Sequence, residues 1–475
     1  MPTEPGTPAN PLLAYGSWLA TCPAQWPAEA IESARRQFID CIAVTVPGAL
    51  ESATRKVLAA VASWGDGQSS AAGHQPGLAA PWAALVNGTA AHALDFDDNF
   101  DPPKAHATAV LAPALLALGE ETGASGKNVI DAYIAGLQVM GRVGQGLNPV
   151  HRNRGWHATA TVGAIGAAAA CARLERLGPQ ESAHALSLAT SMAGGFMAQF
   201  GTMAKPLHAG LAAKAGIMAA RLAQAGVDAS LDALDGPTGM QALMVGPDHA
   251  QLRDALTHIE HGQTLCFETA SVGDPLLILE HGFRVKRYPV CGSAHRAMDG
   301  LLELRETYGL LPARIARIDV HAPASHLTNL MYPAPKTPLE AKFSLEYGLA
   351  TVLLQGSCRL GDFTDSQVMR ANVRALYPRI HRHPVDLPES AFPTRVEVTC
   401  TDGRLLSATV AMPQGSIASP FPITTYWGKF EDCTRGLMMP ADQQKLRDAL
   451  EHLPDLADIS TLAAPMRGIT AAGSD

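Results

Sequence analysis

The chain has 475 residues, of which 47% are hydrophobic and 17% charged, and its formal net charge is −8. A chain of this length exceeds one ordinary hydrophobic core, so we expect two or three domains. The acidic balance argues against a nucleic-acid partner, which requires a basic surface.

The cysteine spacing and the N-terminal residues bear on where in the cell the protein is located. Eight cysteines are scattered without a CxxC pair, which argues against zinc or iron–sulfur sites and fits a reducing environment. The N-terminus lacks the basic and apolar regions of a signal peptide. The longest uncharged run, 186–204, contains Ser, Thr, Gly and Gln, and we interpret it as a buried helix pair instead of a membrane span. We therefore expect a cytoplasmic protein with no membrane partner.

Helical patterns dominate the first part of the chain, because apolar residues recur at three- and four-residue spacing. The segment 155–178 is rich in Gly and Ala, which lets helices approach closely in a bundle. We expect a loop at 63–75, and helices in the ranges 11–62, 81–94, 107–118, 129–147, 155–178 and 180–226, the last of them interrupted at 193–195 and at 201–210.

The pattern changes near residue 276. Residues 315–322 alternate as a strand does, and 395–412 reads as a hairpin around an Asp-Gly turn, with a helical segment at 345–354 between them. Helix returns at 439–465. The sequence therefore predicts a mainly α fold with a smaller α+β domain, divided into 11–275, 276–412 and a segment 413–475 that returns to the helical domain.

The segment 91–106 concentrates titratable groups between two Ala-rich helices. It contains His92, Asp95, Asp97, Asp98, Asp101, Lys104 and His106. Buried carboxylates are costly unless they are paired, so such a cluster favours chemistry or cation binding. A solvated loop between helices is the alternative. The carboxylates and histidines could also chelate a divalent metal, but they lack an obvious ligand array, and we assign no metal.

Four further clusters are candidates for chemistry. His157 precedes a helix, where it would face bound anions or simply cap the helix. Lys205, flanked by Met, Ala and Pro, either binds an anion or is an exposed lysine on a turn. The block 286–295 supplies Lys286 and His295, and Tyr332 lies in a later block.

Five blocks together resemble the signature of the MmgE/PrpD family. They are HALDFDD, GWHATATVGAIGAAAA, FGTMAKPLHAG, YPVCGSAH and EAKFSLEYGLA, in family order, within a resemblance spanning about residues 12–465. The family includes 2-methylcitrate dehydratase, cis-aconitate decarboxylase and iminodisuccinate epimerase. The resemblance implies a large all-helical domain built from both chain ends, a smaller α+β lid, a homodimer and no cofactor.

The resemblance also implies the site residues. The pocket positions carried over are Asp95, His106, His157, Lys205, His295 and Tyr332. The family often has Thr where this chain has Asn99, and the decarboxylase branch has a loop one residue shorter near 101–107. The longer loop and the GTMAKP and LEAKFS blocks look closer to the epimerase branch.

Family reactions share the creation or discharge of a carbanion beside a carboxylate, which needs a tuned acid–base group and cations on the neighbouring carboxylate. We assign His106 and His157 to proton transfer, Asp95 to orienting a histidine, and Tyr332 to the leaving group or an enolate oxygen.

We assign the binding of substrate carboxylates to Lys205 with Lys286 or His295, and we place Asn99 in the same pocket. The partner is then a small di- or tricarboxylate. The leading hypothesis is a dehydratase-like lyase. The alternatives are an isomerase of the epimerase type, a decarboxylase-like lyase, and a non-catalytic binding protein.

Overall fold

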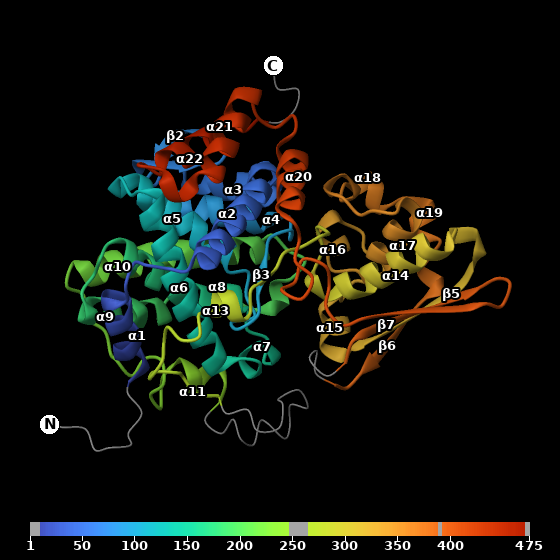
Figure 1. The fold of residues 1–475 in the computed structure, drawn as a ribbon, viewed down its shortest axis with the longest axis horizontal. Helices are drawn as coiled ribbons and strands as arrows, with labels where there is room; N and C mark the ends of the chain where they lie inside the picture. The colour runs from blue at the N-terminus through green and yellow to red at the C-terminus, as the bar shows by residue number, and fades with distance from the viewer. Residues whose placement is uncertain (1–9, 247–264, 388–391, 471–475) are drawn as a thin grey trace.

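The computed structural model describes residues 10–246, 265–387 and 392–470. These residues form a helical body and a smaller α+β lid that lie side by side (Figure 1). Each part has its own hydrophobic core. The predicted fold class, mainly α with a smaller α+β domain, is confirmed.

The body is built first from the N-terminal half of the chain. Side-chain oxygens cap two of its helices, since Asn10 accepts from the amide of Leu13 and Ser125 from that of Asn128. Its helices are α1 (Pro11–Thr21), α2 (Ala28–Gly48), α3 (Ser52–Val61), α4 (Ala80–Ala93), α5 (Thr108–Thr122), α6 (Gly126–Leu147), α7 (Val150–Asn153), α8 (Ala158–Leu174), α9 (Pro179–Thr190), α10 (Ala204–Gln224) and α11 (Met240–Met244).

Close packing of α4 against α10 organises the centre of the body. A Cβ atom built on Gly210 would lie 2.1 Å from the carbonyl oxygen of Leu85, and one built on Gly88 would lie 2.8 Å from the Cα atom of Gly210. Only glycine fits such an approach of two backbones. The packing places the last residues of α4 beside the first residues of α10.

Two predictions for the body are wrong. The expected loop 63–75 contains most of a hairpin formed by β1 (Asp66–Ala71) and β2 (His74–Leu78). The sequence predicts a buried helix pair at 186–204. In the structure α9 already ends at Thr190, and the chain continues through the short 3₁₀ turn η1 (Met197–Gln199) to α10.

Backbone hydrogen bonds explain why helix does not continue through this second segment. The amide of His157 donates to the carbonyl of Gly195 at 3.0 Å, and that of Met197 donates to Gly155 at 2.8 Å. The segment is therefore paired with the chain that enters α8. Phe196 within it is exposed.

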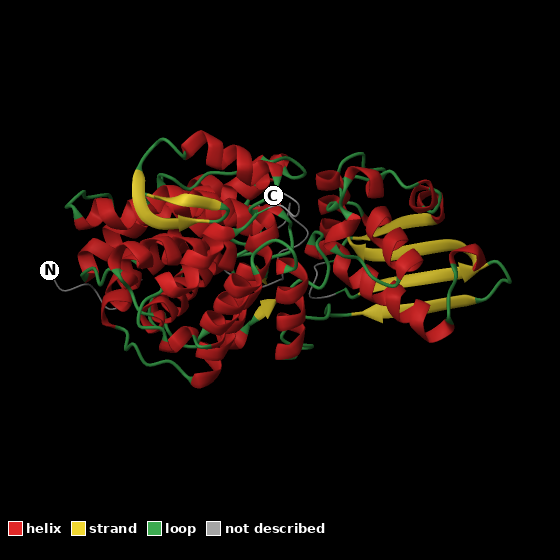
Figure 2. Cartoon of the chain, turned by 90° about the horizontal axis from the view of Figure 1, so that it is seen from above, coloured by secondary structure: helices red, strands yellow, loops and turns green. Residues whose placement is uncertain are grey.

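The lid is a four-stranded sheet with helices on one face (Figure 2). The strand order is β6-β5-β7-β8, with β5 parallel to β6 and the other pairs antiparallel. The strands are β5 (Ile315–Pro323), β6 (Ile380–Val385), β7 (Thr394–Cys400) and β8 (Leu405–Val410). The helices are α14 (His295–Tyr308), α15 (Ala324–Asn329), α16 (Pro338–Ala341), α17 (Leu345–Gln355), α18 (Asp365–Val368) and α19 (Ala371–Arg374).

The chain crosses from body to lid and back at neighbouring points. Residues 277–285, which include α13 (Leu277–Glu280) and β4 (Phe283–Arg284), contribute to the core of the body, and the core of the lid begins at Tyr288. The returning chain runs beside the outgoing one, because the amide of Val285 donates to the carbonyl of Gly415 at 2.9 Å.

The C-terminal segment completes the body. It forms α20 (Ile423–Thr434), α21 (Pro440–Glu451) and α22 (Ser460–Ala463), which pack near α2 and α5 (Figure 1). The body therefore contains both ends of the described chain. In the part of the chain that the structure describes, no helix combines the length and the apolar character that crossing a membrane would require.

Candidate active site

The site is built around the segment 94–99, here called the Asp95 loop, which follows the end of α4. Asp95 has φ 51°, in the left-handed region that residues other than glycine rarely adopt. Asn99 ends the loop in the two-residue strand β3 (Asn99–Phe100), which pairs with β4 of the chain leading to the lid. The loop is thereby fixed at the seam between body and lid.

The carboxylate of Asp95 is held by two ammonium groups. Its Oδ1 atom lies 2.5 Å from Lys205 Nζ and 3.0 Å from Lys286 Nζ, and all three side chains are buried. Burial alone would raise the pKa of Asp95, but Lys205 and Lys286 hold it well below its usual range. Asp95 is therefore ionised, and it organises two cations that lie far apart in the sequence.

A second carboxylate fixes the tautomer of His106. Asp97 Oδ2 accepts a hydrogen bond from Nδ1 of His92 at 2.8 Å and lies 3.2 Å from Nδ1 of His106. The carbonyl oxygen of Asp98 lies 2.8 Å from the same His106 nitrogen. Both neighbours can only accept, so Nδ1 of His106 carries the proton and Nε2 holds a lone pair.

The protonation state of His106 follows from its surroundings. Burial lowers its pKa, against the opposing effect of Asp97, and Lys286 lowers it further. The imidazole is therefore neutral at pH 7, and its Nε2 lies 4.0 Å from Asp95 Oδ1. This is the arrangement of a proton acceptor beside a cationic pair.

His157 is the residue before α8, and it pairs with a histidine of the KPLH block to which no role was assigned from the sequence. Its Nδ1 lies 2.9 Å from Nδ1 of His208, so one of the two nitrogens carries the shared proton. Burial lowers the pKa of both rings, and Lys205 lowers each of them further. The ring of His157 packs edge-on against Phe200 with 5.0 Å between centroids.

His295 opens α14 of the lid. Its Nε2 donates to the carbonyl of Val290 at 3.3 Å, which leaves Nδ1 as the acceptor. Burial, with a further contribution from Lys286, lowers the pKa of His295 to about 3, so this imidazole is also neutral.

These groups face a common cavity of about 490 Å³ at the seam between body and lid. Seven of the eight predicted residues line it: Asp95, Asn99, His106, His157, Lys205, Lys286 and His295. Tyr332 is absent from this lining. Its hydroxyl donates to the carbonyl of Phe200 at 3.3 Å and lies against Gly201, so its predicted contact with substrate stays a prediction.

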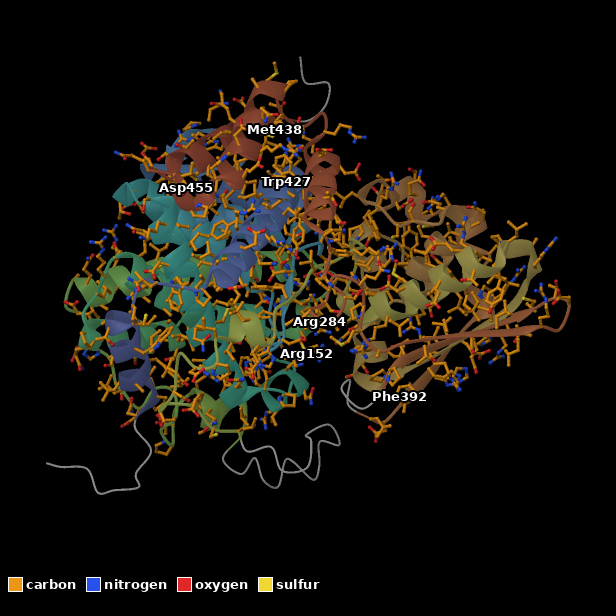
Figure 3. All side chains as sticks on the ribbon, viewed as in Figure 1. Arg152, Arg284, Phe392, Trp427, Met438 and Asp455 are labelled. Carbon is orange, nitrogen blue, oxygen red and sulfur yellow. The ribbon has the colours of Figure 1, made fainter. Side chains whose placement is uncertain are left out.

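The cavity concentrates positive charge in an acidic chain. Its described lining includes six lysines and arginines against two carboxylates. These residues are Lys104, Arg152, Lys205, Arg284, Lys286 and Arg296, and Asp95 and Asp101. Arg152 and Arg284 lie at the seam in Figure 3. A site with this excess of cations is suited to a small polyanion.

Comparison with known families gives a match over most of the chain. The model described as the MmgE/PrpD N-terminal domain matches residues 17–253, and that of the MmgE/PrpD C-terminal domain matches residues 288–455. The chain belongs to the MmgE/PrpD family.

Curated relatives cover nearly the same length as this MmgE/PrpD chain. The cis-aconitate decarboxylase of Mus musculus is 28% identical over 457 residues, with 92% of this chain and 89% of the relative covered. The Homo sapiens enzyme of the same name is 28% identical, with 84% and 82% covered. The Aspergillus terreus enzyme is 26% identical, with 92% and 91% covered.

The arrangement of this MmgE/PrpD site favours an ionic network over a bound metal. Ligand atoms of His92, Asp95, Asp97 and His106 all lie within 4.8 Å of one another, a spacing that a metal would accept. Asp95 Oδ1, however, already holds two ammonium groups, and the Nδ1 protons of both histidines face Asp97 Oδ2 or the carbonyl of Asp98. A cation there would meet like charge and protonated ring nitrogens.

Several residues of the MmgE/PrpD site were not predicted. Phe200 and Phe343 pack over Lys205 Nζ, with 5.4 and 5.1 Å to their centroids, and shield that cation from water. The EAKFS block contained Phe343, although nothing in its spacing marked the ring. His208 lies in the KPLH block that supplied Lys205, three residues further along and so on the same helix face.

Proposed function

We propose that this MmgE/PrpD chain is a lyase that decarboxylates a small unsaturated tricarboxylic acid of the cis-aconitate type. The observation that carries the proposal is the neutral His106, with its Nε2 lone pair, beside Lys205 and Lys286 in a cationic cavity. The cis-aconitate decarboxylases to which the chain is similar support the same reaction.

The reaction needs a carbanion to form and then be protonated. The C–C bond to the departing carboxylate breaks, carbon dioxide leaves, and the electron pair is delocalised over the remaining conjugated carboxylate. Lys205 and Lys286 lie where they can bind such a carboxylate and stabilise its growing charge. The bound polyanion raises the pKa of His106, which takes a proton from solvent and delivers it to carbon.

A dehydratase is the second candidate, and it was the leading expectation from the sequence. Dehydration needs a base for the C–H proton and an acid for the departing hydroxyl. The rings of His106 and His157 both lie near the ring of His92, with centroid distances of 4.4 and 5.9 Å to it, so two imidazoles are available. The epimerase alternative would use the same pair without breaking a carbon–oxygen bond.

Product analysis in D₂O separates these reactions. We expect cis-aconitate to release carbon dioxide and give a product with one solvent deuterium on carbon. Loss of water from a hydroxytricarboxylate would instead identify a dehydratase, and exchange with inversion on an aminodicarboxylate would identify an epimerase. Tight binding of these acids without any turnover would contradict a catalytic function.

His106→Asn tests the central group. We expect kcat to fall by roughly 10²–10⁴-fold, because the variant keeps a polar side chain but cannot transfer a proton. His452→Asn is the matched control, since His452 is exposed at the end of α21. Activity of the His106 variant near that of the control would contradict the assigned role.

A further inference from the structure

Three consecutive carbonyl oxygens of the Asp95 loop each accept a hydrogen bond from a different lysine. Lys342 Nζ donates to Leu94 at 2.6 Å, Lys286 Nζ to Asp95 at 2.8 Å, and Lys429 Nζ to Phe96 at 2.7 Å. Lys342 and Lys286 are buried, and the side chain of Lys429 is 10% exposed.

The three lysines come from different parts of the molecule. Lys286 lies on the crossing from body to lid, Lys342 directly follows α16 of the lid, and Lys429 lies in α20 of the returning C-terminal segment. Lys342 and Lys429 are not among the described lining of the cavity. They act on the site through contacts with its backbone, above all with the backbone of the Asp95 loop.

The loop needs such donors for two reasons. The last carbonyls of a helix have no partner within the helix, and Leu94 is the C-cap residue of α4. Asp95 then takes the left-handed conformation at a position where glycine is usual. A strained residue persists only when its surroundings hold it in place.

Burying a charged lysine side chain reduces the stability of the folded state unless the charge is paired. Lys342 Nζ also donates to the carbonyl of Pro289 at 3.2 Å and lies 4.5 Å from the centroid of Phe363. It forms no ion pair with a carboxylate in the part of the chain that the structure describes. Burial lowers the pKa of Lys342 to about 8. A buried cation without a counter-ion is unfavourable for stability, so a role at the loop explains its presence better.

Among the described residues Lys429, unlike Lys342, forms an ion pair in addition to its hydrogen bond with the Asp95 loop. Its Nζ lies 2.6 Å from Asp40 Oδ1 and 3.7 Å from the centroid of Phe96. It also donates to the carbonyl of Lys286 at 3.4 Å, so it joins the Asp95 loop to the chain segment that crosses from body to lid. Lys286 and Lys429 also line a second cavity of about 450 Å³.

We propose that Lys342 and Lys429 are positioning residues which, with Lys286, hold the carbonyls of Leu94, Asp95 and Phe96. They thereby keep Asp95 in its left-handed conformation, with its carboxylate on Lys205 and Lys286. Because Lys342 belongs to the lid, the loop is fully held only when the lid is docked on the body. The kinetic part of this inference rests on the proposed function, whereas the structural part does not.

Lys342→Met and Lys429→Met test the proposal with two readouts. We expect kcat on cis-aconitate to fall by roughly 10- to 100-fold with a much smaller change in KM, because a misplaced catalytic group impairs the reaction more than binding. Hydrogen–deuterium exchange should be faster in the peptide that spans 94–100. Lys342→Arg and Lys429→Arg, which keep the charge and the donors, should recover part of both losses.

Arg173→Met is the matched control. Arg173 is also a partly buried cation that donates to two carbonyls, those of Leu19 and Cys22, but it holds Asp131 in the body away from the cavity. We expect this variant to lose stability while kcat and exchange at 94–100 stay as in the wild type.

The two readouts distinguish failure of the lysine proposal from failure of the proposed function. Wild-type kinetics and wild-type exchange in either folded Met variant would overturn the proposal for that lysine. If the wild-type chain turns over none of the acids, the proposed function fails, and exchange at 94–100 still decides the role of the lysines. Lys429 has partial solvent access, so its variant provides a test even if Lys342→Met does not fold.

Discussion

At the scale of single residues, the site depends on which nitrogen of each histidine carries a proton. For His106 the answer follows from two acceptors at Nδ1. For His157 it depends on His208, since the two Nδ1 atoms lie 2.9 Å apart and only one can donate. His208 therefore determines whether Nε2 of His157 offers a proton or a lone pair to the substrate.

His208→Leu removes that partner. We expect kcat to fall by about tenfold or more and the pH profile of kcat to change, because His157 then takes either tautomer. His208→Gln should restore most of the activity, since an amide can donate to or accept from Nδ1. Equal kinetics in the Leu and Gln variants would show that His208 does not control His157.

Most of the candidate site could be predicted because its residues sit in contiguous blocks. Asp95, His106 and His157 each belong to a short stretch with unusual charge for its apolar setting, and the structure brings them to one cavity. Lys429 lies outside these blocks, and Lys342 lies inside the EAKFS block without any role assigned to it from the sequence. Their partners are backbone carbonyls, which leave no signal in the sequence, and their segments meet only after folding.

At the scale of elements, the approach of α4 and α10 positions both Asp95 and Lys205. Gly210→Ala should destabilise the protein by about 1–3 kcal/mol, because its Cβ would lie 2.1 Å from the carbonyl oxygen of Leu85. Gly428→Ala is the control, since its Cβ meets no atom within 4 Å and it lies exposed in α20.

The control should change stability in the opposite direction. Alanine in a helix interior is favoured over glycine by roughly 0.5–1 kcal/mol, so Gly428→Ala should raise the midpoint of thermal unfolding. Chemical denaturation of both variants gives the comparison. A Gly210 variant as stable as the wild type would show that the two helices can separate without cost.

Some secondary-structure elements could not be predicted because their sequences lack the usual pattern. Long helices were predictable from apolar spacing, whereas the β1–β2 hairpin is rich in Gly, Ser and Gln and lacks a clear alternation of apolar and polar residues. Strand β6 contains Pro384 and charged residues, which argue against a strand. It is tolerated because β6 is an edge strand, with β5 as its one neighbour in the described sheet.

At the scale of the whole molecule, buried neutral histidines make stability depend on pH. His151 is fully buried, its Nε2 lies 2.9 Å from Thr161 Oγ1, and burial lowers its pKa to about 3. Its ordinary value is 6.5. Between these values the unfolded chain binds a proton that the folded chain does not, so stability falls as pH decreases below about 6.5.

His151→Gln isolates this effect. The free energy of unfolding of the wild type should fall more steeply than that of the variant between about pH 6 and 4, by up to ~1.4 kcal/mol per pH unit for one proton. The comparison is needed because the raised pKa values of the buried Asp40 and Asp98 act in the opposite direction. Parallel pH curves would show that His151 is protonated in the folded state.

The neighbouring crossings at Val285 and Gly415 have a consequence for engineering. Because the lid leaves and rejoins the body at adjacent points, it is an insertion whose two ends nearly touch. A lid from another family member could be grafted by matching only these two junctions, and a swing of the lid would bend both at once about a common axis. Such chimaeras would show which half of the molecule selects the substrate.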